Sequence, residues 1–298
     1  MGALLDALGQ PITHCIQIWR RYMWHFLVLY ILLLGLVLLT LKSKLNGGAP
    51  VSAPEKVHSP YSPPLPVIVS KALVLAKVRE ENVSWVDDFQ PQWTPYIYTA
   101  DHEPGYLPVP ENKGRESMAY LTHIIDNYDT LTDITVFMHA SATQWHNDVG
   151  ETNSSNVLSM LHLEAVQQKG YVNLRCQHRP GCPTAVRPFD PEFVSSYSTV
   201  YRNFTAIYTK LFNTSLDTVP KEIGGVCCGQ FALTKERIRQ RRLKDYVHMR
   251  DWAFSTSLDN FSVGSVFEML WHLVFLEDPV SCPDTQQCYC ELYGLCNE

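Results

Sequence analysis

Hydrophobic and polar residues are arranged along the chain in a pattern that predicts a membrane segment followed by a folded domain. The first long apolar run, residues 22–41, contains no Asp, Glu, Lys or Arg. About 20 apolar residues are what an α-helix needs to cross ~30 Å of hydrocarbon. A cleaved signal peptide is the alternative, but its apolar core usually has about 7–15 residues and a small-residue cleavage site follows it closely. We therefore expect an uncleaved anchor.

The segment after this run is rich in proline, with six prolines between residues 50 and 66. Such a segment disfavours helix and adopts extended polyproline geometry. The rest of the chain is long enough for one domain with its own core. The predicted organisation is a cytosolic tail (1–21), a transmembrane signal anchor (22–41), a stem (42–66) and a lumenal domain (67–298).

Within the domain, apolar runs bounded by polar or turn-forming residues predict alternating strands and helices. Met118, Leu121 and Ile125 recur at helical spacing and predict one buried helix face. Strands alternating with helices indicate an α/β fold with a mixed or mostly parallel sheet flanked by helices. The predicted strands are 72–78, 96–99, 134–138 and 226–234, and the predicted helices are 115–128, 157–168, 235–242, 246–255 and 263–275.

The net charge of −6 argues against a nucleic-acid partner, because such proteins carry a basic surplus on one face. Flanking charges do not orient the anchor, since two basic residues lie on each side of it. Eight of the nine cysteines and all five Asn-x-Ser/Thr sequons follow the anchor, which places the domain in the lumen of the secretory pathway. The sequon asparagines are Asn82, Asn153, Asn203, Asn213 and Asn260.

The eight cysteines beyond the anchor form an even set that predicts disulfides, with no pairing deducible from spacing. A zinc cluster is the alternative, but no Cys-x-x-Cys occurs. If adjacent Cys227 and Cys228 lie on a strand they point to opposite faces, so we expect each to bond a different partner. The other six are Cys176, Cys182, Cys282, Cys288, Cys290 and Cys296.

Two imidazoles and a carboxylate, His139, His146 and Asp148, follow the predicted strand 134–138. Ligands bind outside the carboxyl ends of strands in open α/β sheets. These side chains suit a divalent cation, Mn²⁺ or Mg²⁺, or proton transfer. The alternative is loop histidines hydrogen-bonded to backbone.

Glu268 and His272 are separated by four residues in an otherwise apolar helix, so they share one face. They are candidates for a catalytic base and its orienting partner, and a structural ion pair is the alternative.

A glycine precedes the predicted helix 115–128, and helix N-terminal amides with basic neighbours hold anions. Asn112, Lys113, Arg115 and Glu116 are therefore candidate substrate-binding residues. The alternative is a charged first turn that suits the helix dipole. The basic run 235–244 predicts a solvated face rather than a phosphate site.

The ordered segments NKGRESMAYLTHIIDNYD, ITVFMHA, WHND, CCGQFALTKERI, FEMLWHLVF and CYCELYGLC closely resemble a fungal family catalogued as domain of unknown function 3431. The likeness runs from Ala72 to Cys296. It implies membership of that family and no particular reaction.

The order of strands, the Asn-x-Gly-x-Glu helix and the late QF strand also look like GT-A type nucleotide-sugar glycosyltransferases. Such enzymes usually carry Asp-x-Asp after the third strand to hold a metal-bound diphosphate, and here His139, His146 and Asp148 take its place. The likeness implies that Asp87 or Asp88 and Asp101 contact a nucleotide and that Lys113 and Arg115 contact its diphosphate. Glu268 would then deprotonate the acceptor hydroxyl.

The leading hypothesis is a single-pass type II Golgi or ER membrane protein that is a glycosyltransferase-like enzyme acting on a glycan, lipid or small metabolite. A non-catalytic lumenal binding or assembly protein and a metal-dependent tailoring enzyme of secondary metabolism are the alternatives.

Overall fold

The computed structural model describes residues 26–38, 69–195 and 198–296, and the chain divides into two units at residue 66. In the first unit, residues 26–38 form a helix whose side chains are almost all exposed. Among the residues that are described, no helix has both the length and the apolar character needed to span a bilayer. Both ends of the predicted anchor, the tail and the stem lie outside the described residues, so the anchor stays a prediction.

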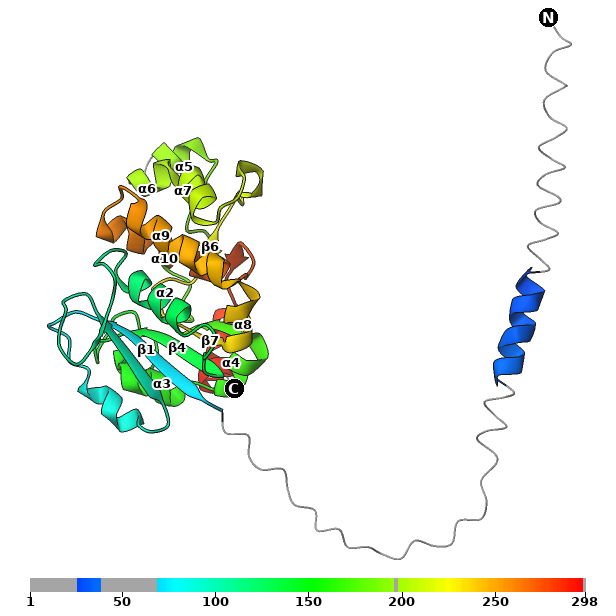
Figure 1. The fold of residues 1–298 in the computed structure, drawn as a ribbon, viewed down its shortest axis with the longest axis horizontal. Coiled ribbons are helices and arrows are strands. Elements are labelled where there is room, and N and C mark those ends of the chain that lie inside the picture. The colour runs from blue at the N-terminus through cyan, green and yellow to red at the C-terminus, as the bar shows by residue number, and fades with distance from the viewer. Residues whose placement is uncertain (1–25, 39–68, 196–197, 297–298) are drawn as a thin grey trace, which may run out of the picture. The chain divides into compact units, whose positions relative to one another are not determined.

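The second unit is built on a six-stranded sheet with the order β3-β2-β1-β4-β7-β5 (Figure 1). β1 pairs in parallel with β2 and β4, and β2 pairs in parallel with β3, whereas β7 runs antiparallel to β4 and β5. This sheet confirms the predicted α/β fold with a mostly parallel sheet. The strands are β1 (Lys71–Lys77), β2 (Thr94–Thr99), β3 (Leu107–Pro108), β4 (Ile134–His139), β5 (Tyr171–Asn173) and β7 (Phe231–Thr234), with β6 (Gly224–Gly225) and β8 (Val280–Ser281) in a small separate sheet.

Helices cover both faces of the sheet, because successive strand residues point to opposite sides. Val74 and Phe137 pack with α2, α9 and α10, while Leu75 and Met138 pack with α3, α4 and α11 (Figure 1). The helices are α2 (Glu116–Asp126), α3 (Ser154–Met160), α4 (Leu163–Lys169), α5 (Pro191–Ser195), α6 (Thr199–Arg202), α7 (Phe204–Leu211), α8 (Lys235–Gln240), α9 (Leu243–Ser255), α10 (Asn260–Val274) and α11 (Thr285–Tyr293), with short 3-10 turns η1 (Ser84–Phe89), η2 (Gly150–Thr152) and η3 (Leu216–Thr218).

Two predicted elements differ from the structure. The predicted helix 157–168 is two helices, α3 and α4, because the backbone is extended at Leu161 and the His162 amide donates to the Leu292 carbonyl, 2.8 Å away. The predicted strand 226–234 begins only at Phe231, because Cys228 and Gly229 adopt φ angles of 92° and 60°.

All eight described cysteines form disulfides, as predicted. The bonds are Cys176–Cys288, Cys182–Cys282, Cys227–Cys228 and Cys290–Cys296. The expectation that Cys227 and Cys228 bond different partners is wrong. It assumed a pleated strand at these residues, and the positive φ of Cys228 replaces that strand with a turn.

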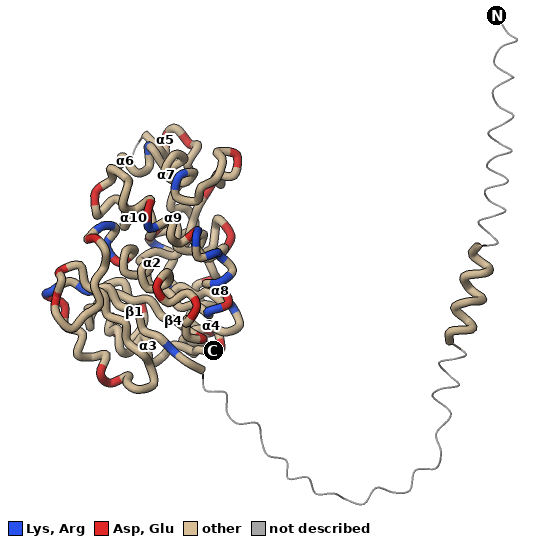
Figure 2. Tube along the Cα trace, in the orientation of Figure 1, with Lys and Arg blue, Asp and Glu red and all other residues tan. Residues whose placement is uncertain are grey.

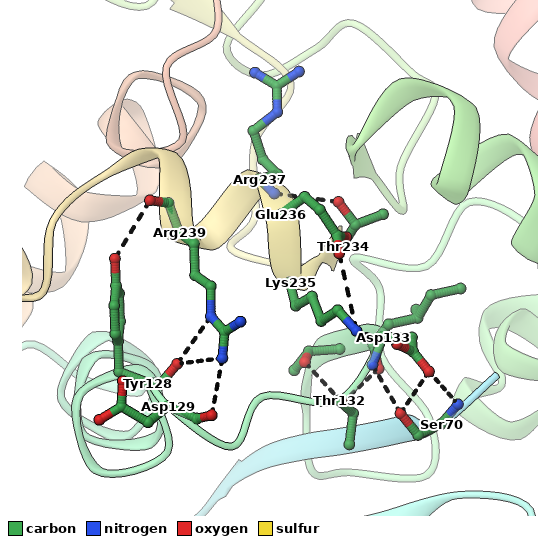
Figure 3. Close-up of polar contacts among 12 residues, drawn as sticks. Ser70, Tyr128, Asp129, Thr132, Asp133, Thr234, Lys235, Glu236, Arg237 and Arg239 are labelled. Carbon is green, nitrogen blue, oxygen red and sulfur yellow. Dashed lines mark hydrogen bonds and ion pairs between the residues drawn. The ribbon is translucent and has the colours of Figure 1, made fainter.

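The basic run around α8 acts differently from the predicted solvated face. Figure 2 marks its charges along α8, and Figure 3 shows Arg239 donating to the carbonyls of Tyr128 and Asp129, beyond the end of α2. Arg241 donates to the carbonyls of Leu273 and Val274 at the end of α10. The last carbonyls of a helix lack intrahelical partners. These arginines therefore link the segment around α8 to the C-terminal ends of α2 and α10.

Arg241→Gln should lower the free energy of unfolding by about 1–3 kcal/mol, because two carbonyls lose charge-assisted hydrogen bonds. Arg242→Gln is the control, because the exposed Arg242 pairs with nearby Asp245 and its removal should leave the free energy of unfolding nearly unchanged. Urea unfolding of both variants measures the difference. Equal losses in the two would contradict the helix-end role.

Candidate functional site

The candidate site lies where the strand order changes direction. From β1 the chain continues to β2 on one side, and β4 is then added on the other side. The carboxyl ends of β1 and β4 meet there, with Ala76 opposite His139. Open α/β sheets bind ligands in the crevice at such a point.

His139 is the last residue of β4, and its side chain is hydrogen-bonded to the turn that precedes β7. Its Nε2 lies 3.0 Å from the Cys228 carbonyl oxygen. A carbonyl only accepts, so Nε2 carries the proton and Nδ1 is left unprotonated. The His139 backbone amide donates to Oε1 of Gln230, whose Nε2 donates to Oδ1 of Asn147. Because Gln230 and Asn147 are both buried, this chain fixes the loop after β4 against β7.

Arg115 and Glu116 enter the same region from the start of α2. Gly114 precedes them with φ 83°, and a Cβ there would lie 2.9 Å from Cγ1 of Val263 on α10. Only glycine therefore lets α2 begin this close to α10. The Arg115 side chain crosses Gly264 and its guanidinium lies 4.5 Å from the Phe261 ring centroid. Within the described residues this guanidinium has no hydrogen bond or ion pair to a side chain.

Glu268 projects from α10 into a cavity of about 540 Å³. Cys227, Gly181 and Phe261 line the same cavity. α10 begins at its N-cap Asp259, which accepts from the Ser262 amide, and it buries Val263, Phe267 and Trp271 on its apolar face. That packing holds Glu268 at the cavity wall. We call Arg115, Glu116, His139, Cys228 and Glu268 the edge cluster.

Burial and neighbouring charge shift the pKa values in this cluster. Burial raises the pKa of Glu116 to about 7, against smaller opposing effects of its own amide and of Arg115. Burial, followed by the nearby Glu116 carboxylate, raises the pKa of Glu268, while the Cys228 amide and Arg115 act in the opposite direction. Burial lowers the pKa of His139 to about 4, so its imidazole is neutral at physiological pH. The cluster therefore combines a neutral imidazole with two carboxyl groups suited to proton transfer.

The predicted metal ligands do not converge. The rings of His139 and His146 lie 4.6 Å apart between centroids, but Asp148 accepts from the amides of Cys176 and Gln177 and from the Tyr289 hydroxyl. In the described chain, the one group of three His, Cys, Asp or Glu side chains whose ligand atoms lie within 4.8 Å is Cys227, Cys228 and Glu268. Disulfide sulfurs are not thiolates, so this group does not suit a metal. Use of a divalent cation stays a prediction.

The two predicted diphosphate ligands, Lys113 and Arg115, do not point to the same place either. Lys113 donates to the carbonyls of Phe254 and Thr256 at the end of α9, whereas the Arg115 guanidinium lies over the Phe261 ring. Asn112 Oδ1 accepts from Asn260, which in turn accepts from the Arg115 amide.

The two predicted nucleotide-contacting aspartates lie on the β1 and β2 side. Asp88 is exposed on η1, and Asp101 follows β2 and accepts from the Arg79 amide. Asp87, the alternative to Asp88, lines a cavity of about 390 Å³ together with Arg79 and Lys77, and neither Asp88 nor Asp101 lines it.

Glu268 and His272 do not form a pair. His272 lines a different cavity, of about 510 Å³, and its Nε2 lies 3.2 Å from the Pro279 carbonyl oxygen. Burial lowers its pKa to about 4. A hypothetical Cβ on Gly225 would lie 2.5 Å from its Nδ1, so the ring fills a structural position. The expectation that it orients Glu268 is therefore corrected.

Sequence reasoning missed Cys228, Gln230, Asn147 and Lys77 as functional or positioning residues. Cys228 contributes backbone groups, which no side-chain pattern reveals. Lys77 is buried at the end of β1, 2.6 Å from Glu103, and stacks over the Tyr106 ring. A lysine that ends an apolar strand run was the available signal for it.

The predicted glycosylation sites differ in exposure. Asn153 is half-buried and caps α3 by accepting from the amides of Ser155 and Asn156. The remaining four sequon asparagines are exposed, and they are Asn82, Asn203, Asn213 and Asn260.

Fold and edge cluster together define an α/β protein with a candidate acid–base site at the carboxyl edge of a mostly parallel sheet. The chain belongs to the family described as protein of unknown function (DUF3431), whose model matches residues 73–291. This confirms the family resemblance seen in the sequence. No curated protein and no solved structure matches the chain.

Replacing Glu116 by Gln should change how stability depends on pH. Its folded pKa, about 7, is raised above the ordinary value of 4.5, so the stability it contributes is full below pH 4.5 and is lost as pH rises through 7. Glu116→Gln should therefore be more stable than wild type at pH 8 by on the order of 3 kcal/mol, with the gap closing near pH 4.5. Urea unfolding at several pH values measures this gap. The exposed Glu111→Gln is the control, and a gap independent of pH would contradict the assignment.

Proposed function

We propose that this chain is a glycosyltransferase-like enzyme in which Glu268 takes the proton from an acceptor hydroxyl. The observation that carries the proposal is the position of Glu268 in the wall of a cavity, with its pKa raised by burial and by Glu116. A base works best when its pKa lies near the working pH. The acceptor is a glycan, lipid or small metabolite.

The sheet supports a nucleotide-sugar donor. In doubly wound sheets the nucleotide lies across the carboxyl ends at the point where strand order reverses. Here that point has Lys77 and a cavity on the β1 and β2 side, and Arg115 on the α10 side. Arg115 offers a guanidinium to a diphosphate, which guanidinium groups bind in bidentate fashion. Use of a divalent cation with the diphosphate stays a prediction, and no step is assigned to a metal.

We also propose that the domain faces the lumen of the Golgi or ER, anchored by residues 22–41 as a type II membrane protein. Four disulfides favour an oxidising compartment. The five sequons agree with that compartment.

Thermal shift of the full-length protein in detergent tests the donor. UDP and GDP sugars are screened with Mn²⁺, with Mg²⁺ and with EDTA. At least one donor should raise the melting temperature, because a ligand that binds only the folded state stabilises it. Arg115→Ala should abolish that shift while Lys113→Met keeps it. Folded protein that responds to no donor would overturn the proposal.

A non-catalytic lumenal binding protein is the second candidate. It is favoured by the structural hydrogen bonds that occupy Lys113, Asp148 and His272. Ligand binding without turnover of any donor would support it.

A further inference from the structure

We infer that Trp145 is a stacking platform for a pyranose ring of a glycan acceptor. The inference rests on the proposed function, because it names the substrate class for the same site. Trp145 is 65% exposed in the loop after β4. By contrast, Trp93, Trp252 and Trp271 are each less than 10% exposed. An indole offers a large, flat apolar face with a polar N–H, which suits stacking against a ligand.

The indole is held in place by its neighbours. The ring centroids of Trp145 and His146 lie 4.1 Å apart, and those of His146 and His139 lie 4.6 Å apart. His139 ends β4, so the three rings form a contiguous row that begins at the end of this strand. The Arg175 guanidinium lies 5.8 Å from the Trp145 ring, and it donates to the carbonyls of Trp145 and His146. A ring fixed in advance loses little conformational entropy when a ligand stacks on it.

Two chains of contacts join Trp145 to the cavity that Glu268 lines. Arg175 also donates to the Arg179 carbonyl, and the next two residues, Pro180 and Gly181, line that cavity. On the other side, His139 contacts the Cys228 carbonyl, and neighbouring Cys227 lines the cavity as well. The loop that carries Trp145 is therefore joined to the cavity wall, and a glycan that extends out of the cavity toward this loop would meet the indole.

The chemistry around Trp145 favours a neutral sugar. Arg175 is buried and already donates to three backbone carbonyls, so it is not available to an anion. The C–H face of a pyranose would cover the indole.

Saturation-transfer NMR on the full-length protein in detergent tests the inference. The probes are methyl glycosides of mannobiose, lactose and cellobiose, added without any donor. At least one should bind, and Trp145→Ala should weaken its binding 10-fold or more. Trp145→Phe keeps a ring and should bind within about threefold of wild type. Phe189→Ala is the control, because Phe189 is a second exposed aromatic that lines a different cavity.

The outcomes separate this inference from the proposed function. Absence of binding by every probe, or unchanged binding by Trp145→Ala, overturns the platform. Loss of the nucleotide-sugar thermal shift in Trp145→Ala also overturns it, because the indole would then contact the donor. Glycan binding that depends on Trp145 in a protein that responds to no donor supports the platform and overturns the transferase. Thermal unfolding of Trp145→Ala should match wild type, since an exposed side chain adds little to stability.

Discussion

Glu268→Gln should lower kcat by about 10²- to 10⁴-fold with little loss of the free energy of unfolding. Glutamine keeps the shape and hydrogen-bonding capacity of the side chain but does not take a proton. Stability should hold because, within the described residues, no cation pairs with Glu268. In the wild type, kcat should rise with pH through the raised pKa of Glu268, because the base must be ionised to act. Initial rates with the donor found by thermal shift, measured across pH, test both statements.

Glu277→Gln is the matched control. Burial also raises the pKa of Glu277, but it lines the His272 cavity and lies 3.1 Å from Arg237. Removal of the Glu277 carboxylate breaks its ion pair with Arg237, so Glu277→Gln should lower the free energy of unfolding and leave kcat unchanged. Full activity in Glu268→Gln would overturn its role as the base. A loss of about 3–5 kcal/mol of stability in Glu268→Gln would instead indicate a buried charge pair.

Removal of the Cys176–Cys288 disulfide should lower the free energy of unfolding by about 3 kcal/mol. The bond joins residues 112 apart in sequence, but Cys182–Cys282 already closes a loop of 100 residues inside it, so in the unfolded chain Cys176–Cys288 restricts only the two short segments outside that loop. The double variant Cys176→Ser/Cys288→Ser is compared with wild type by guanidinium unfolding under oxidising conditions.

The matched control is Cys290→Ser/Cys296→Ser, which opens a loop with a separation of only 6 residues. Its effect should be smaller by only about 0.6 kcal/mol, from the logarithmic dependence on loop length. A difference of more than about 2 kcal/mol between the two double variants would show that local packing around each bond, rather than loop closure, sets its contribution.

The main layers of the fold could be read from the sequence because they depend on local periodicity. β1 and β4 are short apolar runs, and α2 and α10 carry apolar stripes at helical spacing. Each pattern is complete within a dozen or so residues, so no distant contact is needed to recognise it. The even set of cysteines likewise predicted disulfides from composition alone.

The candidate site was predictable only in part. Glu268 stood out as a carboxylate in an apolar helix, and Arg115, Glu116 and His139 were named from their places beside predicted helix and strand ends. The hydrogen-bond partners of the polar side chains in this region were not predictable. Lys113 reaches carbonyls 141 and 143 residues away, and Gln230 bonds Asn147 across 83 residues.

The sequence by itself therefore determined the α/β class, the layered helices, the oxidised cysteines and the residues that carry charge into the core, because side-chain type and local spacing are enough for these. Only the tertiary structure decided that Cys227 bonds Cys228, that Glu268 and His272 line different cavities, and that Asp148 binds backbone amides. The physical reason is that a hydrogen bond or a disulfide depends on atoms a few ångströms apart in space, whatever their separation along the chain.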